Sequence, residues 1–181
     1  EVYNKDYETV IVLGAVMKYD EKLGDWAFPD VIEEYVGRLV MGNYRAMAAA
    51  VFHEHAQKLL VTGGSDTHPY TGEKCSRSGE LIKRIKQYSV PEDKLVDIGK
   101  TGASHTKGNL ENTIAYLEQN IASFKERVLG ILSPTFQARR AEMMYRDTSW
   151  LKQKNFGINM LLIEDILAQH DPRLEKKFED L

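Results

Sequence analysis

The sequence predicts an α/β fold, a three-layer α/β/α sandwich with a mostly parallel sheet of about five strands. Three apolar runs carry this prediction, and each ends in a turn of small or hydroxyl residues: VIVLGA at 10–15, LLVTGGSD at 59–66 and VLGILSPT at 128–135. A segment that reads as helix follows each turn. Strands that alternate with helices at this spacing form βαβ units with right-handed crossovers. The turns then gather at the carboxyl edge of the sheet, where ligands bind in such folds.

The expected strands are short and apolar, without polar alternation. This pattern is typical of parallel strands that are buried on both faces. We place five strands at 9–13, 59–62, 94–98, 128–132 and 158–163. The segments 15–29 and 65–78 read as loops, and the second is longer than the usual connection in these folds, which favours a functional role.

Apolar residues at helical spacing place the helices between these strands. We expect helices over 30–56, divided near Gly42-Asn43, over 79–88 and over 110–124. Ser133-Pro134 predicts a further helix start, with Ser as the N-cap, and Asp171-Pro172 begins a terminal helix. We expect a single domain over 1–181; the alternative, two subdomains split near residue 90, has no flexible linker to support it.

Composition excludes several classes of protein. A net charge of −3 and a pI near 6.0 argue against a nucleic-acid partner. No apolar run approaches the roughly 20 residues of a membrane span. The single cysteine, Cys75, rules out an intrachain disulfide and a CxxC metal site, and fits a reducing compartment. We therefore expect a cytoplasmic protein, and leave open what preceded Glu1.

The glycine turns lack the two best-known nucleotide signatures. No GxGxxG follows the first strand, where Gly14-Ala15 stands, and no Walker A lysine follows a glycine loop. NAD binding and P-loop hydrolysis are therefore disfavoured. Gly14 still lets backbone approach a ligand, and Gly63-Gly64-Ser65 can form a nest of N–H donors; an ordinary tight turn explains each equally well.

Other candidates lie at the starts of expected helices. Ser104, Thr106 and Asn109 together suit a hydroxyl- or phosphate-binding set, although each alone is more simply a helix cap. The Arg140 guanidinium has the length to reach back over its helix start toward an anion, or it belongs to a surface arginine pair. Glu80 is a candidate general base, or a carboxylate that favours the helix dipole.

No metal site is expected. His53 and His55, two residues apart on a helix, point to different faces. Asp66 and His68 share one loop, and two candidate ligands do not make a site.

Several of these features occur in a fixed order. They are a strand ending VLGA, Arg45 in the next helix, a strand ending VTGG, a helix starting at Glu80 and ending in Val90-Pro91, a Ser104-x-Thr106-x-x-Asn109 run, and a strand ending in Ser133 followed by Arg140-Ala141. Together they resemble the YdcF/SanA/ElyC-type domain family over roughly residues 9–146. The resemblance implies a Rossmann-like fold and a pocket at the carboxyl edge formed by these segments, with Arg45 and Gln137 among its residues.

The resemblance fixes the reaction less well than the fold. One cytosolic member is linked to S-adenosylmethionine binding, which makes that molecule a candidate cofactor, and membrane-anchored members are tied to cell-envelope maintenance and peptidoglycan precursors. This chain departs from the family at two positions. Gln137 stands where a histidine is common, and Thr101 where an acid is expected, which leaves Asp97 as the closest carboxylate.

Three hypotheses follow. In the first, the protein is an enzyme for an anionic, phosphorylated or nucleotide-like molecule, with Gly63, Gly64 and Arg140 holding the anion and Glu80 as base. In the second, which Gln137 motivates, it binds S-adenosylmethionine or a nucleoside without turnover. In the third, it is a scaffold with a vestigial pocket, because helix capping explains the Ser, Thr and Asn residues. The sequence does not predict an oligomeric state.

Overall fold

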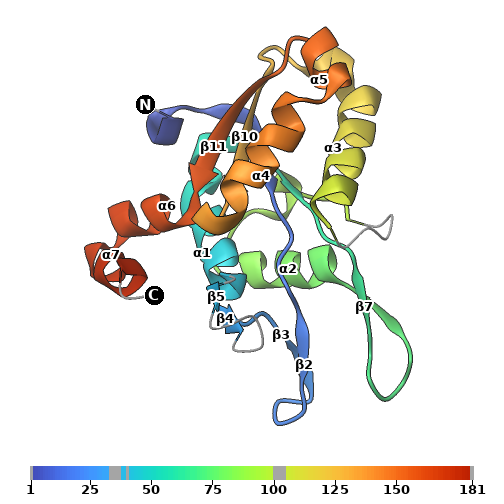
Figure 1. Ribbon diagram of the computed structural model, residues 1–181, viewed down its shortest axis with the longest axis vertical. Coiled ribbons are helices and arrows are strands. Elements are labelled where there is room, and N and C mark those ends of the chain that lie inside the picture. Colours follow the sequence, from blue (N-terminus) through green and yellow to red (C-terminus); the bar gives the residue numbers. More distant parts are fainter. Residues whose placement is uncertain (1, 33–37, 40, 100–104, 180–181) are drawn as a thin grey trace.

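A computed structural model describes residues 2–32, 38–39, 41–99 and 105–179 (Figure 1). Its centre is a five-stranded sheet in which every neighbouring pair is parallel, in the order β11-β10-β1-β6-β9. The strands are β1 (Tyr7–Val12), β6 (Ala56–Val61), β9 (Leu95–Asp97), β10 (Val128–Ser133) and β11 (Gly157–Leu162). The sequence prediction of five strands in these regions is confirmed.

Two apolar clusters lie on opposite faces of the sheet, which makes the fold a Rossmann-like three-layer sandwich. On one face Val10 and Val12 pack with α1 (Gly42–Phe52), α2 (Arg77–Lys86) and α6 (Ile163–His170). On the other face Ile11 and Leu13 pack with α3 (Thr106–Asn120), α4 (Thr135–Arg146) and α5 (Ser149–Gln153). Successive β1 side chains alternate between the two clusters, as the pleat of a strand requires. Helices therefore cover both faces of the sheet, and this burial explains why the strands are continuous apolar runs in the sequence.

Two segments that the sequence analysis reads as loops contain hairpins. The segment after β1 forms β2 (Lys18–Asp20) and β3 (Asp25–Ala27), and the segment after β6 forms β7 (Ser65–Thr67) and β8 (Lys74–Ser76). In Figure 1 both hairpins project from the end of the molecule opposite to α5. The expected order of turn then helix is therefore wrong for the first two turns, because a hairpin intervenes.

The expected helix over 30–56 is also wrong in its first part. Val31–Ile32 and Arg38–Leu39 pair as the short antiparallel strands β4 and β5, and α1 begins only at Gly42, with Met41 in the left-handed conformation (φ 58°) before it. The division expected near Gly42-Asn43 thus marks the start of a helix. Helix α2 begins two residues earlier than expected, and α3 four residues earlier.

The remaining elements are short. Helix α7 (Pro172–Glu179) begins where Asp171-Pro172 predicts, whereas α5 and α6 were not expected. The 3-10 turns are η1 (Val2–Asn4), η3 (His53–His55), η4 (Glu92–Lys94) and η5 (Ile121–Ser123). Within the described ranges, no helix is long and apolar enough to cross a membrane.

Candidate functional site

The strand order creates a topological switch point at the carboxyl edge. Neighbouring strands β1 and β10 send the chain to opposite faces of the sheet, since α1 packs on one face and α4 on the other. In open α/β sheets the crevice outside such a pair of strands is the preferred ligand site. The carboxyl ends of β1 and β10 are therefore the expected place for a ligand.

The turns after β1 and β6 touch each other through their glycines. Gly14 donates its N–H to Thr62 Oγ1 at 2.9 Å, and that hydroxyl donates to the carbonyl of Val12 at 3.1 Å. A Cβ on Gly14 would lie 2.8 Å from the Cα of Gly63, which is closer than real contacts allow. Close backbone approach is thus the reason for glycine at position 14, and the neighbouring Ala15 is buried.

The second turn presents backbone N–H donors at its glycines. Gly63 and Gly64 are both buried, and among the described residues the N–H of neither has a hydrogen-bond acceptor. The Gly64 carbonyl accepts from the N–H of Arg77 at 2.9 Å, and Ser65 pairs with Ser76 as the first residue of the β7–β8 hairpin. Buried N–H groups are nearly always paired, which makes these two donors the candidates for an anion contact.

A hydroxyl relay lies beside this turn. Ser78 is fully buried and donates to Asp97 Oδ1 at 2.6 Å, while Ser76 lies 3.0 Å from Ser78 Oγ and accepts from the N–H of Gly79. Because the Ser78 proton goes to the carboxylate, the Ser76 hydroxyl is the donor to Ser78. The relay therefore runs from Ser76 through Ser78 to Asp97, which also accepts from the N–H of Gly99 at 3.0 Å.

The start of α3 holds an unpaired acceptor. Thr106 and Asn109 are buried, and Asn109, 4% exposed, has no partner for its Oδ1 among the described residues. The side chain that caps this helix is His105, whose Nδ1 accepts from the N–H of Gly108 at 3.1 Å. The capping role expected of Thr106 and Asn109 is therefore wrong. Ser104 lies outside the described residues.

Arg45 is the buried cation at the switch point. Its Nη1 donates to the carbonyl of Leu13 at 3.0 Å and its Nη2 to Gln137 Oε1 at 3.1 Å, so it joins the end of β1 to the first turn of α4. Burial lowers the pKa of Arg45 to about 10, against the opposing charge of Glu164, and the guanidinium stays protonated at neutral pH. Gln137 thus occupies its position as an acceptor for a buried arginine.

The start of α4 differs from the prediction. Ser133 does not cap the helix; its hydroxyl donates to the carbonyl of Pro134, and α4 begins at Thr135. The Thr135 N–H donates instead to both carboxylate oxygens of Glu164, at 2.9 and 3.2 Å. Glu164 lies 29 positions after Thr135, so no local sequence pattern indicates this contact. Arg140 lies exposed on α4, and its role toward an anion stays a prediction.

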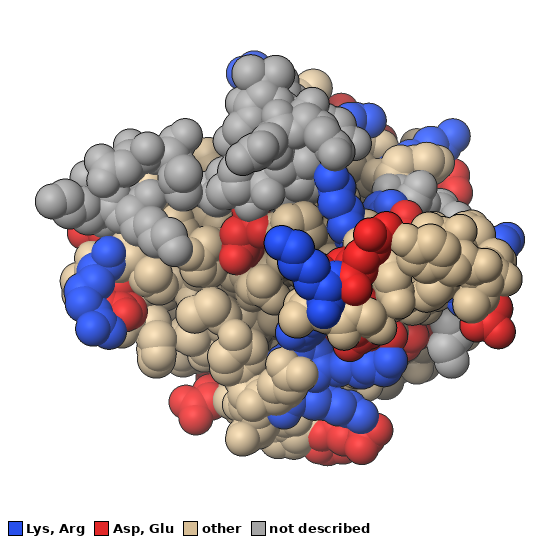
Figure 2. Space-filling view, turned by 90° about the horizontal axis from the view of Figure 1, so that it is seen from below, with Lys and Arg blue, Asp and Glu red and all other residues tan. Residues whose placement is uncertain are grey.

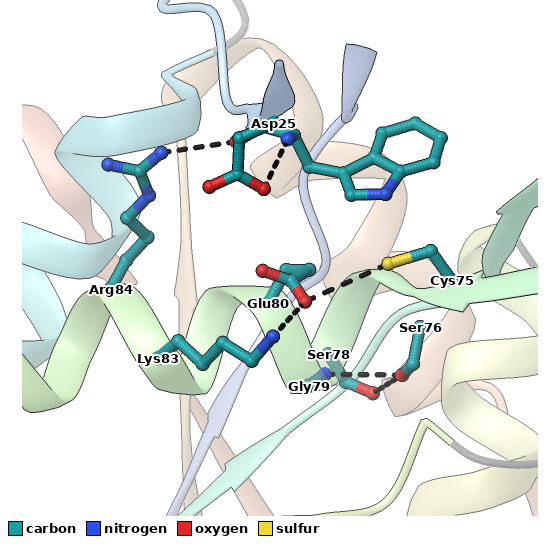
Figure 3. A network of polar contacts seen from close by, with 9 residues as sticks. Asp25, Cys75, Ser76, Ser78, Gly79, Glu80, Lys83 and Arg84 are labelled. Atoms are coloured by element: carbon teal, nitrogen blue, oxygen red, sulfur yellow. Dashed lines mark hydrogen bonds and ion pairs between the residues drawn. The ribbon is translucent and has the colours of Figure 1, made fainter. Parts of the chain in front are cut away.

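Glu80 lies in the first turn of α2 with its carboxylate mostly buried. It forms an ion pair with Lys83, and the Cys75 thiol donates to it at 3.7 Å; Figure 3 shows Glu80 between these two side chains. Burial and the Glu80 charge raise the pKa of Cys75, which disfavours a thiolate nucleophile. The same helix is tied to the first hairpin, because Arg84 donates to the carbonyl of Trp26 at 3.2 Å.

Comparisons of the chain with models of protein families, with curated proteins and with solved structures gave no match. The resemblance to the YdcF/SanA/ElyC-type family therefore stays a prediction. The candidate site depends on its own geometry. In the part of the chain that the structure describes, the N–H groups of the β6 turn and Asn109 Oδ1 have no partner, and two hydroxyls lead to the Asp97 carboxylate.

Proposed function

We propose that the protein binds a small anionic molecule, phosphorylated or nucleotide-like, at the carboxyl edge of its sheet, and acts on it as an enzyme. The observation that carries this proposal is the pair of buried N–H groups of Gly63 and Gly64, which have no acceptor among the described residues. A phosphate or carboxylate oxygen would satisfy both donors, and adjacent backbone N–H groups form the usual anion-binding nest.

The acceptor at the start of α3 defines a second requirement. An amide oxygen accepts and cannot donate, so Asn109 Oδ1 calls for a hydroxyl or amino group on the ligand. A molecule that carries both an anionic group and donors, such as a nucleotide or a sugar phosphate, meets both needs. Leaving either set unpaired in the free protein costs stability that a ligand restores.

The catalytic role is the less supported half of the proposal. Glu80 is our candidate base, with its carboxylate at the start of α2, and the Ser76–Ser78–Asp97 relay offers a second route for a proton. Glu80 and Ser78 belong to α2, and Asp97 is the last residue of β9, the neighbour of β6 in the sheet. Glu80→Gln should then lower turnover about a hundredfold or more while leaving ligand affinity within about twofold, because it removes no donor or acceptor of the anion nest.

The alternative is a binding module for S-adenosylmethionine or another nucleoside. Gln137 favours it, because a side-chain amide that holds Arg45 does not exchange protons at neutral pH. The two functions differ in one measurement. Conversion of a bound nucleotide by the purified wild-type protein supports the enzyme, and stable binding without conversion supports the module.

Thermal-shift screening against nucleotides, sugar phosphates and S-adenosylmethionine tests the site itself. A ligand at 100 times its dissociation constant should add about 2.7 kcal/mol to the free energy of unfolding. Asn109→Ala should weaken its binding about tenfold through the lost hydrogen bond, and Asn120→Ala, at the other end of α3, should not. A screen without any stabilising ligand, or equal affinity for Asn109→Ala and wild type, would contradict the proposal.

A further inference from the structure

A hollow lies between the β2–β3 and β7–β8 hairpins. Its volume is about 400 Å³, and Lys18, Tyr19, Glu21, Trp26, Asp66 and Thr67 line it. Figure 2 views the molecule from the end from which the hairpins project, and acidic and basic side chains are interspersed over that face. The hollow is therefore built by the two hairpins, neither of which the strand–turn–helix pattern requires.

Aromatic rings form one side of this hollow. Tyr19 meets Trp26 edge to face with ring centroids 5.7 Å apart, and His68, from the second hairpin, lies 4.3 Å from the Tyr19 ring. His68 is fixed in turn, since its Nδ1 accepts the N–H groups of Tyr70 and Thr71, each at 3.2 Å. Tyr and Trp rings held in this way offer a rigid apolar surface with polar edges.

Carboxylates provide the polar groups beside the rings. Glu21 accepts from the Tyr70 hydroxyl through one oxygen, and its other oxygen has no partner among the described residues. Both oxygens of Asp66 accept from Arg77, at 2.6 Å each, which anchors the second hairpin to α2. Carboxylates only accept hydrogen bonds, so a ligand here has to bring donors.

We propose that this hollow binds a neutral saccharide ring, in addition to the anion at the carboxyl edge. A sugar ring has an apolar C–H face that can pack on Tyr19 and Trp26, and hydroxyl donors around its rim for Glu21. A binding surface of aromatic rings with a few placed polar groups is typical of small-molecule sites. The Glu21 carboxylate at the edge of the hollow disfavours a second anionic ligand, since the other carboxylate, Asp66, is already paired with Arg77.

Tryptophan fluorescence gives a direct test. The chain has two tryptophans, and Trp150 stacks on Phe156 in the cluster on the opposite face, so Trp150→Phe leaves Trp26 as the only reporter. Maltotriose, cellotriose and triacetylchitotriose are titrated into this variant. We expect a saturable change in Trp26 emission with at least one of them.

Three further variants separate binding from folding. Tyr19→Ala should weaken the binding about tenfold, whereas Tyr88→Ala, which alters an exposed tyrosine two residues past the end of α2, should leave it unchanged. Glu21→Gln keeps every ring and an acceptor for Tyr70, and should weaken binding severalfold. Choline chloride tests whether the rings bind a cation instead of a sugar. The proposal is overturned if no trisaccharide gives a saturable change, if choline chloride alone gives one, or if both Tyr19→Ala and Glu21→Gln bind as tightly as wild type.

Discussion

At the scale of single residues, Cys75 shows how a neighbouring carboxylate controls reactivity. Burial and the Glu80 charge both raise the pKa of the thiol, so Glu80→Gln should lower it. The thiolate fraction at a given pH then rises, and the midpoint of the pH profile for alkylation by iodoacetamide should move to lower pH. Below this midpoint we expect the rate to increase about threefold or more.

The single cysteine makes this measurement unambiguous. Glu92→Gln is the matched control, because Glu92 pairs with Lys86 at the far end of α2 and should leave the profile in place. An unchanged profile in Glu80→Gln would show that burial alone sets the pKa of Cys75.

Arg45 provides a second prediction at this scale. Replacing it with Met removes the donor to Leu13 and Gln137 and leaves two acceptors unpaired in a buried place. The free energy of unfolding in urea should fall by about 2 kcal/mol or more. Arg139→Met, on the exposed side of α4, should change it by less than about 0.5 kcal/mol. Equal losses in both variants would argue against a bridging role for Arg45.

Residue roles were predictable from sequence only where a role depends on neighbours in the chain. Gly14 and Gly63 directly follow the expected strands, so glycine turns at these points could be predicted, whereas the contact between the two turns could not. The bond from Ser78 to Asp97 spans 19 positions and the one from Arg45 to Gln137 spans 92, and no local pattern marks such pairs. His105 was passed over as the cap of α3 because Ser, Thr and Asn are the usual caps.

At the scale of elements, two glycines should respond to alanine in opposite ways. A Cβ at position 14 meets the backbone of Gly63 at 2.8 Å, so Gly14→Ala should lower the free energy of unfolding by about 1–3 kcal/mol. Gly79 lies inside α2, where a Cβ meets only ordinary contacts at 3.5 Å, so Gly79→Ala should raise it by about 0.5–1 kcal/mol. Urea unfolding measures both, and a stable Gly14→Ala protein would show that the two turns can separate.

The hairpins escaped sequence analysis because their strands have only three residues each. Three residues are too few to show the alternation that identifies a half-buried strand. Strands β4 and β5, after Pro29, were missed for another reason. Each has only two residues, and the surrounding segment 30–56 has a helical composition. The central strands were found because burial on both faces leaves an uninterrupted apolar run.

At the scale of the whole molecule, the sequence predicts the layers but not the strand order. Right-handed crossovers are compatible with several orders, and the side on which α3 crosses decides where the switch point lies. Here α3 passes to the face opposite to α1 and α2, and β10 therefore lies against β1. The position of the candidate site is a consequence of that one crossover.

The two apolar clusters share the sheet, and this predicts how the molecule unfolds. Trp26 packs against the cluster on the face of α1, and Trp150 against the cluster on the face of α4. Every central strand contributes to both clusters, so we expect them to unfold together. In each of the variants Trp26→Phe and Trp150→Phe, the fluorescence of the remaining tryptophan should change at the same urea concentration as the far-UV circular dichroism. If Trp26 emission changes at lower urea than circular dichroism in the Trp150→Phe protein, the hairpins unfold as a unit of their own, and the single-domain prediction fails for that part of the chain.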